Sequence, residues 1–408
     1  MEFFALNNVS KQVKQYLVIT GNYWAFTLTD GALRMLVVLY FHQLGYSPLN
    51  IAMLFLFYEI FGVVTNLVGG WLGARLGLNK TMNIGLALQI IALAMLAVPT
   101  DMLTIAYVMA AQALSGIAKD LNKMSAKSSI KLLVPKDAEG KLYQWVALLT
   151  GSKNTLKGIG FFLGGLLLTL LEFTGAVLLM ASLLAIVWLF SLLALKEDLG
   201  KANEKPKFKD IFSKSSSINV LSAARLFLFS ARDVWFVVAL PVFLAVTFHW
   251  DHWWVGGFMA SWVIGYGVVQ SIAPIITGRV TDTTQGKVPT GRSAFLWASY
   301  LSFIPAAIAL ALHFNFHIQA VIIIGLLIFG VVFAINSSLH SYLIVSYASS
   351  DGVSLDVGFY YMANAMGRLI GTVLSGWLYQ EYGLEACLWV SCIFIVLTSL
   401  LSVKLPNE

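Results

Sequence analysis

The 408-residue chain is poor in charged side chains, which make up 11% of it, whereas soluble domains carry about 25%. So few charged residues cannot cover the surface of a water-soluble protein of this length. We therefore expect lipid to cover much of the surface of this protein. Cysteine is also scarce. Cys387 and Cys392 lie five residues apart in one apolar segment, where helical spacing points them in different directions. We therefore expect neither a disulfide nor a thiolate metal site.

Three features of other protein classes are missing from the sequence. It has no glycine-rich phosphate loop for ATP, no clustered set of catalytic residues and no soluble sensing domain. We therefore expect no enzyme, receptor or cofactor. Any energy that the protein uses should come from a gradient or an exchanged ion rather than from ATP. The first apolar run contains Asp30 and Arg34, is too long for a cleaved signal peptide and lacks a small-residue cleavage site.

Long apolar segments dominate what is present. A helix needs about 20 apolar residues to cross a bilayer, and a lipid-facing backbone must satisfy its own hydrogen bonds. We therefore predict an all-α membrane protein with twelve transmembrane helices. The predicted spans are 16–41, 50–72, 82–98, 103–130, 143–171, 176–195, 219–247, 253–277, 294–312, 318–346, 357–379 and 386–403.

The basic residues outside these spans indicate the orientation. Of the 26 Lys and Arg residues, nine lie within the spans, and the other 17 all lie on one side of the membrane. Because basic loops stay in the cytoplasm, we predict an inner-membrane protein with both termini cytoplasmic. The loops on the opposite side contain no Lys or Arg, and their acidic residues are Asp101, Glu172, Asp251, Glu381 and Glu385.

The longest polar break, KEDLGKANEKPKFKDIFSKSSS, begins at Lys196 and contains six lysines. It divides the chain into an N-terminal six-helix bundle at 1–195, a cytoplasmic linker at 196–218 and a C-terminal six-helix bundle at 219–408. We expect two pseudo-symmetric halves and a monomer that binds no nucleic acid.

The loop after the second span, GGWLGARLGLNK, resembles the loop signature of the major facilitator superfamily, G-x-L-a-D-R-x-G-R-K. Ala74 stands where that signature has an acid, and the loop after the eighth span keeps one, Asp282. The resemblance implies the two-bundle fold of that family and a gating role for Arg75 and Asp282. The matching residues are Gly70, Leu72, Arg75 and Gly77.

The fifth span contains GSKNTLKGIGFFLGG, whose glycines resemble the glycine motif of drug antiporters, with Phe161 in place of a proline. Close packing of helices through small residues is the other interpretation. A drug:proton antiporter therefore remains an alternative function.

Three longer stretches resemble the organoarsenical efflux permeases of the ArsJ type. The resemblance implies export of 1-arseno-3-phosphoglycerate, arsenate resistance, and a functional link to glyceraldehyde-3-phosphate dehydrogenase, which forms this ester when arsenate replaces phosphate. The stretches are YWAFTLTDGALRMLVVLYFHQLGYSP from Tyr23, LSGIAKDLNKMSAKSSIKLLVP from Leu114 and LLTGSKNTLKGIGFFLGG from Leu148.

Charged residues inside the spans are the evidence for an anionic substrate. Each costs roughly 2.5–3.5 kcal/mol at the bilayer centre, and nine cations face four acids, so five cations need water, a cavity or a substrate. The cations are Arg34, Lys119, Lys123, Lys127, Lys153, Lys157, Arg225, Arg232 and Arg368. The acids are Asp30, Glu59, Asp120 and Asp233.

We expect the substrate to contact the deeper cations and several amides. The predicted binding residues are Arg34, Lys119, Lys123, Lys153, Lys157, Arg232, Arg368, Asn154, Asn336 and Asn364. The predicted coupling or gating residues are Asp30, Glu59, Asp120, Asp233, Arg75 and Asp282.

Other interpretations of these charges stay open. Asp30 and Arg34 could form an internal pair at i, i+4, and Lys123, Lys127 and Arg225 could reach the inner interface as anchors. Arg232 and Asp233 are adjacent and do not face one another on a helix, so we expect each to pair elsewhere. An exchanger of organophosphates or other anions is the main alternative to organoarsenical efflux.

Overall fold

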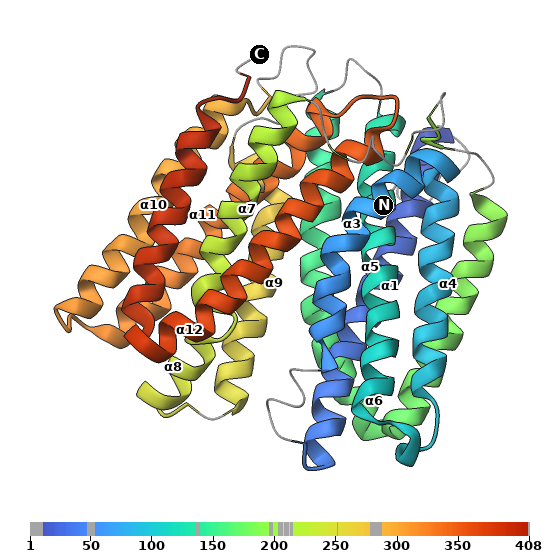
Figure 1. Ribbon diagram of the computed structural model, residues 1–408, viewed down its shortest axis with the longest axis horizontal. Helices are drawn as coiled ribbons and strands as arrows, with labels where there is room; N and C mark the ends of the chain where they lie inside the picture. Colours follow the sequence, from blue (N-terminus) through green and yellow to red (C-terminus); the bar gives the residue numbers. More distant parts are fainter. Residues whose placement is uncertain are drawn as a thin grey trace, which may run out of the picture. The chain divides into compact units, whose positions relative to one another are not determined.

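The computed structural model describes residues 11–46, 54–134, 139–195, 199–202, 207, 212, 215–250, 252–277 and 288–406. Within these residues all regular secondary structure is helical (Figure 1). The elements are α1 (Lys11–Gln43), α3 (Leu56–Leu76), α4 (Leu78–Leu96), the short 3₁₀ helix η2 (Thr100–Met102), α5 (Ile105–Leu133), α6 (Glu139–Ala194), α7 (Ser216–Phe236), α8 (Ala239–Thr247), α9 (His252–Ile276), α10 (Gly291–His313), α11 (Ile318–Tyr347) and α12 (Val353–Ser402).

Two of these elements are pairs of helices joined at a sharp change of direction. The backbone of α6 leaves helical geometry at Glu172 (φ 58°), and that of α12 leaves it at Gly383 (φ 77°). Both positions fall between segments that the sequence predicted as separate spans. Nine helices of the described part are long and apolar enough to cross a membrane, and the charge-rich α5 is not among them. The all-helical prediction is confirmed, and the number of crossings stays a prediction.

Gly77 separates α3 from α4 and explains one glycine of the loop signature. Its φ of 96° lies in a region that favours glycine because a side chain would clash there. Its amide nitrogen donates to the carbonyl oxygen of Gly73, which closes the last turn of α3. The chain can therefore start a new helix at Leu78 without an intervening loop.

The chain packs as two compact units. Unit 1 comprises Met1–Trp145, Ile159–Ile211 and Ala348–Gly358, and unit 2 comprises Val146–Gly158, Phe212–Tyr347 and Phe359–Glu408. Each unit thus contains a short segment from the other half of the sequence. The division at 196–218 that the sequence suggested stays a prediction.

In unit 1, α5 packs against α1, α3 and α4, and Figure 1 shows α3 and α5 side by side. Small residues permit this approach. A Cβ atom on Gly116 of α5 would lie 2.7 Å from the carbonyl oxygen of Tyr58 on α3. The contact holds Tyr58 against α5, whose charged residues lie one turn further along the helix.

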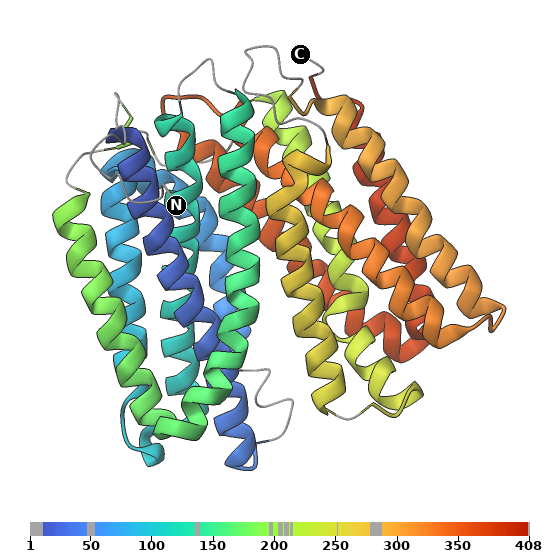
Figure 2. The same ribbon diagram turned by 180° about the vertical axis from the view of Figure 1, so that it is seen from behind.

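In unit 2, α11 packs against α9 and α10, and Figure 2 shows α10 and α11 as neighbours. Aromatic rings fill the space between the helices. Trp235 and Phe329 meet edge to face with centroids 5.0 Å apart. Trp262 donates its indole N–H to the carbonyl oxygen of Leu326 at 2.9 Å, so its polar atom is satisfied inside an apolar core.

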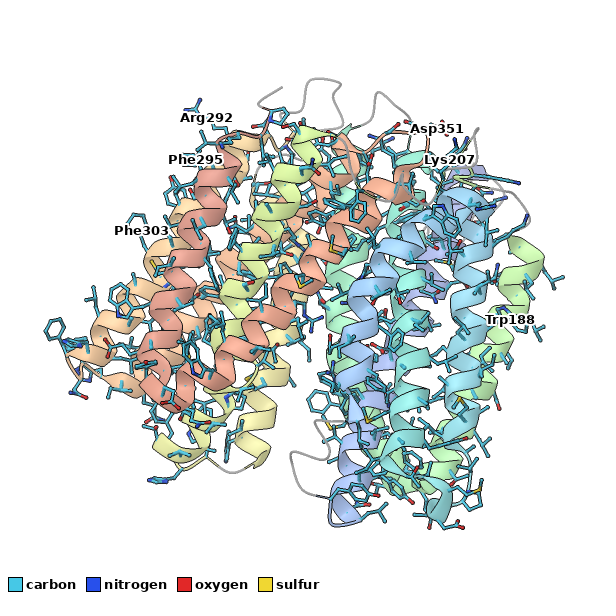
Figure 3. The ribbon with its side chains drawn as sticks, viewed as in Figure 1. Trp188, Lys207, Arg292, Phe295, Phe303 and Asp351 are labelled. Atoms are coloured by element: carbon cyan, nitrogen blue, oxygen red, sulfur yellow. The ribbon has the colours of Figure 1, made fainter. Side chains whose placement is uncertain are left out.

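The outer helix surfaces are apolar. Phe303 points away from α10 (Figure 3) and is 71% exposed, as is Leu193 on α6. Exposed aromatic and aliphatic side chains at this density are unfavourable in water and suit contact with lipid tails.

Candidate functional site

Tyr58 lies at the centre of the polar cluster in unit 1. Its hydroxyl donates to Asp30 Oδ1 at 2.7 Å, which links α3 to α1. The ammonium nitrogen of Lys119 lies 3.7 Å from the centre of its ring, and the guanidinium carbon of Arg34 lies 5.4 Å from it. A buried tyrosine thus contacts one acid through its hydroxyl and two cations through its ring.

Arg34 pairs with an acid on a different helix. Its Nη2 lies 3.3 Å from Glu59 Oε1, and both side chains are about 30% exposed. Glu59, one of the predicted coupling or gating residues, thus contacts a predicted binding residue. Asp30, one turn before Arg34, is instead bonded to Tyr58, so the local i, i+4 pair is not the arrangement that forms.

Asp120 on α5 is shared by two lysines. Lys123 Nζ lies 2.5 Å from its Oδ1 and Lys119 Nζ lies 3.8 Å from its Oδ2. The carboxylate is almost fully buried against Gly62 of α3, where a Cβ atom would lie 3.0 Å from Oδ2. Lys127, one turn further, is 3% exposed and does not reach the surface as an anchor.

Asp233 holds the corresponding cluster in unit 2. Its Oδ1 lies 2.5 Å from Arg232 Nη2, and its Oδ2 accepts from Arg368 Nε on α12 at 3.2 Å. The sequence predicted that Arg232 and Asp233 would each pair elsewhere. Asp233 does so with Arg368, whereas for Arg232 the prediction is wrong, because its long side chain folds back onto its neighbour. Asp233 is fully buried, whereas the side chain of Arg368 is 34% exposed.

Arg225 on α7 has neutral partners. Its Nε donates to Asn364 Oδ1 at 2.8 Å and its Nη1 donates to the carbonyl oxygen of Ser337 at 3.3 Å. Its guanidinium carbon lies 4.0 Å from the centre of the Phe229 ring. The residue is 3% exposed, so it is not a surface anchor.

A chain of hydrogen bonds connects this arginine to α6. Lys153 Nζ donates to Asn154 Oδ1 at 3.3 Å, and Asn154 Nδ2 donates to Gln270 Oε1 at 2.7 Å. Gln270 Nε2 then donates to the hydroxyl of Ser337, which also accepts from Tyr266. Lys153, Asn154 and Asn364 are thereby joined in one network, and their role in substrate binding stays a prediction.

Asn336 lies outside this network. Its amide nitrogen donates to the carbonyl oxygens of Trp297 and Val332, which ties α11 to α10. Such bonds between helices are what a buried amide in a membrane helix ordinarily makes.

The two units differ in their balance of charge. In unit 1 the acids Asp30, Glu59 and Asp120 face Arg34, Lys119, Lys123 and Lys127 within the predicted spans. In unit 2 a single acid, Asp233, faces Lys153, Lys157, Arg225, Arg232 and Arg368. Four of the five excess positive charges therefore belong to unit 2, and most of the unit 1 cations have a carboxylate partner.

Arg75 stacks against Trp71, with its guanidinium carbon 5.0 Å from the ring centre. In the part of the chain that the structure describes, no carboxylate pairs with it. The preceding Ala74 is fully buried, and its carbonyl oxygen accepts from the amide of Ala202. An acid at position 74 would be buried under that segment. Asp282, the other predicted gating residue, lies outside the described residues.

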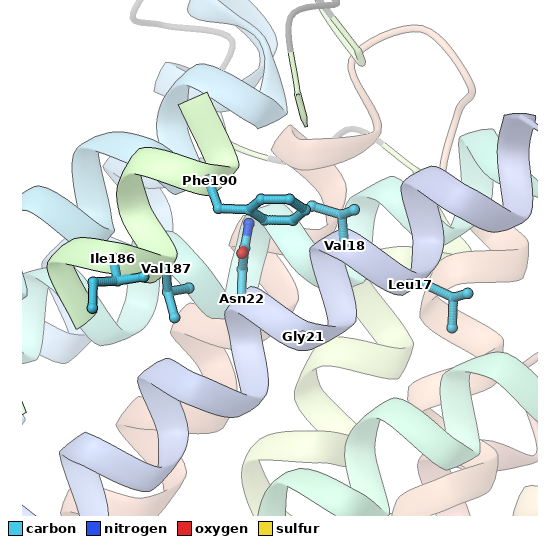
Figure 4. Close-up of a pocket in the computed structure, with 7 residues that line it drawn as sticks. All are labelled: Leu17, Val18, Gly21, Asn22, Ile186, Val187 and Phe190. Carbon is cyan, nitrogen blue, oxygen red and sulfur yellow. The ribbon is translucent and has the colours of Figure 1, made fainter. Parts of the chain in front are cut away.

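Unit 1 also has an apolar groove of about 540 Å³ between α1 and the second part of α6 (Figure 4). Its one polar lining side chain, Asn22, donates to Ser191 at 2.8 Å. The remaining lining residues are Leu17, Val18, Gly21, Ile186, Val187 and Phe190. This groove lacks the charge that an anion would need.

The glycines of the fifth span pack closely against neighbouring helices. A Cβ atom on Gly160 would lie 2.8 Å from the carbonyl oxygen of Leu28 on α1, and one on Gly267 of α9 would lie 2.7 Å from the carbonyl oxygen of Gly151. The packing interpretation of these glycines is therefore the one that the structure supports.

Comparison with known proteins identifies the family. The sequence model described as Major Facilitator Superfamily matches residues 19–355. No curated protein sequence matches the chain.

Several solved structures have a similar fold. The human organic anion transporter MFSD10 (TETRAN) is 16% identical, with 97% of this chain and 100% of that one covered and a TM-score of 0.74. A bacterial homologue of the iron transporter ferroportin in the outward-facing state is 14% identical, with 97% and 99% covered and a TM-score of 0.73. The E. coli fucose:proton symporter FucP is 11% identical, with 97% and 99% covered and a TM-score of 0.73.

These identities show a shared fold and leave the substrate open. The family model, by contrast, spans most of the sequence, and the described residues form the helical architecture that the family uses. The chain belongs to the Major Facilitator Superfamily, whose members are membrane transporters of small substrates.

Proposed function

We propose that this transporter carries a small, multiply charged anion. The observation that supports the proposal is the charge of unit 2, where five cations within predicted spans face one carboxylate. An excess of positive charge on residues of predicted membrane spans favours an anion over a cation as substrate. A site of this charge repels metal ions and organic cations, which argues against a drug:proton antiporter.

Arginine suits the chemistry of the proposed substrate. A guanidinium group presents paired N–H donors to two oxygens of a carboxylate, phosphate or arsenate group. Arg232 and Arg368 come from two helices to one carboxylate, Asp233. An oxyanion that displaces the carboxylate of Asp233 could therefore accept hydrogen bonds from both guanidinium groups at once.

We propose 1-arseno-3-phosphoglycerate as the specific cargo, exported across the inner membrane by alternating access. This part rests on the resemblance of three long sequence stretches to the organoarsenical efflux permeases. Export would confer arsenate resistance in cells where glyceraldehyde-3-phosphate dehydrogenase forms the ester. An exchanger of ordinary organophosphates is the second candidate, because the same charges would bind a phosphate monoester.

Arsenate resistance tests the specific cargo. Arsenate-sensitive cells would carry the transporter with or without the dehydrogenase, and their growth would be measured over a range of arsenate concentrations. The proposal expects resistance only when both proteins are present. Resistance without the dehydrogenase would contradict an organoarsenical substrate.

Counterflow in proteoliposomes separates the two candidates. Vesicles loaded with glycerol 3-phosphate are mixed with external labelled glycerol phosphate or with freshly formed arseno ester. An organophosphate exchanger accumulates the former, and the proposed exporter prefers the latter. Uptake of neither by correctly reconstituted protein would contradict anion transport as a whole.

A further inference from the structure

Helix α7 carries two arginines on one face. Arg225 and Arg232 are seven residues apart, close to two full turns of helix. The ring of Phe229 contacts both, with its centre 4.0 Å from the guanidinium carbon of Arg225 and 4.9 Å from that of Arg232. The two guanidinium carbons are therefore at most about 9 Å apart, close enough to contact one short molecule.

The two arginines differ in their partners. Arg232 shares a buried carboxylate, Asp233, with Arg368. Arg225 is bonded to an amide oxygen of Asn364 and a carbonyl oxygen of Ser337, and within the described residues it contacts no carboxylate. A cation buried to this degree among neutral groups is unfavourable unless an anion joins it.

His340 is a second, independent observation that points to a ligand near Arg225. It is fully buried on α11, one turn after Ser337, and neither ring nitrogen has a hydrogen-bond partner among the residues that the structure describes. Ser337, on the preceding turn of α11, accepts a hydrogen bond from Arg225 through its carbonyl oxygen, so His340 and Arg225 belong to the same region of unit 2. A neutral imidazole always has one N–H to donate, and here that donor has no partner.

We propose that Arg225 and Arg232 are the two ends of one binding site, and that its substrate is a short acid with an anionic group at each end. Arg225, with Asn364 and His340, binds one end. Arg232 and Arg368 bind the other. The inference rests on the proposed anion transport and adds the shape of the anion to it.

The dimensions fit a three-carbon acid. Ordinary bond lengths place the anionic ends of such a molecule about 6 Å apart. A molecule of that length can contact both guanidinium groups when it lies alongside the two arginines, whose guanidinium carbons are at most about 9 Å apart. A shorter anion, or one charged at a single end, would contact only one of the two arginines.

The exposure of the side chains gives an order of binding. Arg368 is 34% exposed and Arg232 is 14% exposed, so their end of the site is reached first. Arg225 is covered by the rings of Phe229 and Tyr360, whose centres lie 4.0 and 5.3 Å from its guanidinium carbon. The contact with Arg225 is therefore the second to form.

Two stable probes test the site in the purified full-length protein. 3-Phosphoglycerate has a phosphate at one end and a carboxylate at the other, and glycerol 3-phosphate has the phosphate alone. Calorimetry should show the wild type binding 3-phosphoglycerate about tenfold more tightly or better, the effect of one additional charge-assisted contact. Arg225→Gln keeps hydrogen-bonding capacity without the charge, and it should remove this preference, so that the variant binds the two probes with similar affinity.

Control variants separate binding from folding. Arg292→Gln, the same change at an exposed position near the start of α10 (Figure 3), should keep the full preference. Arg225→Lys, which retains the charge, should keep part of the preference, and His340→Gln should reduce it. A full preference in Arg225→Gln would overturn the inference, as would equal binding of both probes by the wild type. Binding of neither probe by the wild type would instead overturn the proposed anion transport.

Discussion

Arg368 on α12 donates its Nε to Asp233 Oδ2 on α7 at 3.2 Å, a contact between residues 135 positions apart in sequence. We predict that Arg368→Ala abolishes transport while the protein stays in the membrane. The carboxylate keeps Arg232 as its partner, so the fold survives, whereas the anion loses one of two converging donors. Uptake into inverted membrane vesicles, normalised to protein in the membrane, measures the effect. Arg292→Ala is the matched control, and normal transport by Arg368→Ala would remove this residue from the site.

Asp233 itself should contribute to stability. Its carboxylate is fully buried and lies against two guanidinium groups. Removing one partner of a buried ion pair costs about 3–5 kcal/mol because the other charge is left uncompensated. We therefore expect Asp233→Asn to lower the melting temperature in detergent markedly. The double variant Asp233→Asn with Arg232→Gln should recover part of the loss, and no recovery would argue against the pairing.

The hydroxyl of Tyr58 should contribute measurably to the free energy of unfolding of unit 1. Tyr58→Phe keeps the ring beside Lys119 but leaves the buried carboxylate of Asp30 without its hydrogen bond. Losing a partner of a buried polar group costs about 1–3 kcal/mol. The melting temperature of Tyr58→Phe in detergent should therefore fall. Tyr382→Phe, at a residue that is 65% exposed, should have no effect, and equal melting of both variants would contradict the prediction.

The helices could be predicted from the sequence because hydrophobicity alone fixes them. Runs of about 20 apolar residues must be helical in lipid, and most of the described residues in each predicted span are helical. Contacts between residues of one helix could also be predicted from the sequence. Lys123 lies one turn from Asp120 on the same helix, and the two are in contact at 2.5 Å. Spacing along one helix is enough to predict such a pair.

Contacts between different helices could not be predicted from the sequence in the same way. Arg34 bonds Glu59 on α3 rather than the nearby Asp30, because the rotation and packing of two helices decide which acid faces it. Arg225 could be interpreted as an interfacial anchor, since its position along the helix does not show which way its side chain points. Tyr58 is an aromatic residue in an apolar span, and such residues ordinarily fill a core. Nothing in the sequence distinguished it.

The close approach of α6 to α1 provides the last prediction, which compares two glycines on one helix. A Cβ atom on Gly160 would lie 2.8 Å from the carbonyl oxygen of Leu28 and 3.0 Å from the amide nitrogen of Ala32, both backbone atoms that cannot rotate away. Gly160→Ala should therefore destabilise the protein by about 1–3 kcal/mol, the usual cost of overpacking. A Cβ atom on Gly165 would lie 3.6 Å from its nearest neighbour, a flexible leucine methyl group. Gly165→Ala should thus be neutral or slightly stabilising, since alanine favours the helix. Melting temperatures in detergent measure both variants, and a Gly160→Ala protein as stable as Gly165→Ala would show that the two helices are not packed this closely.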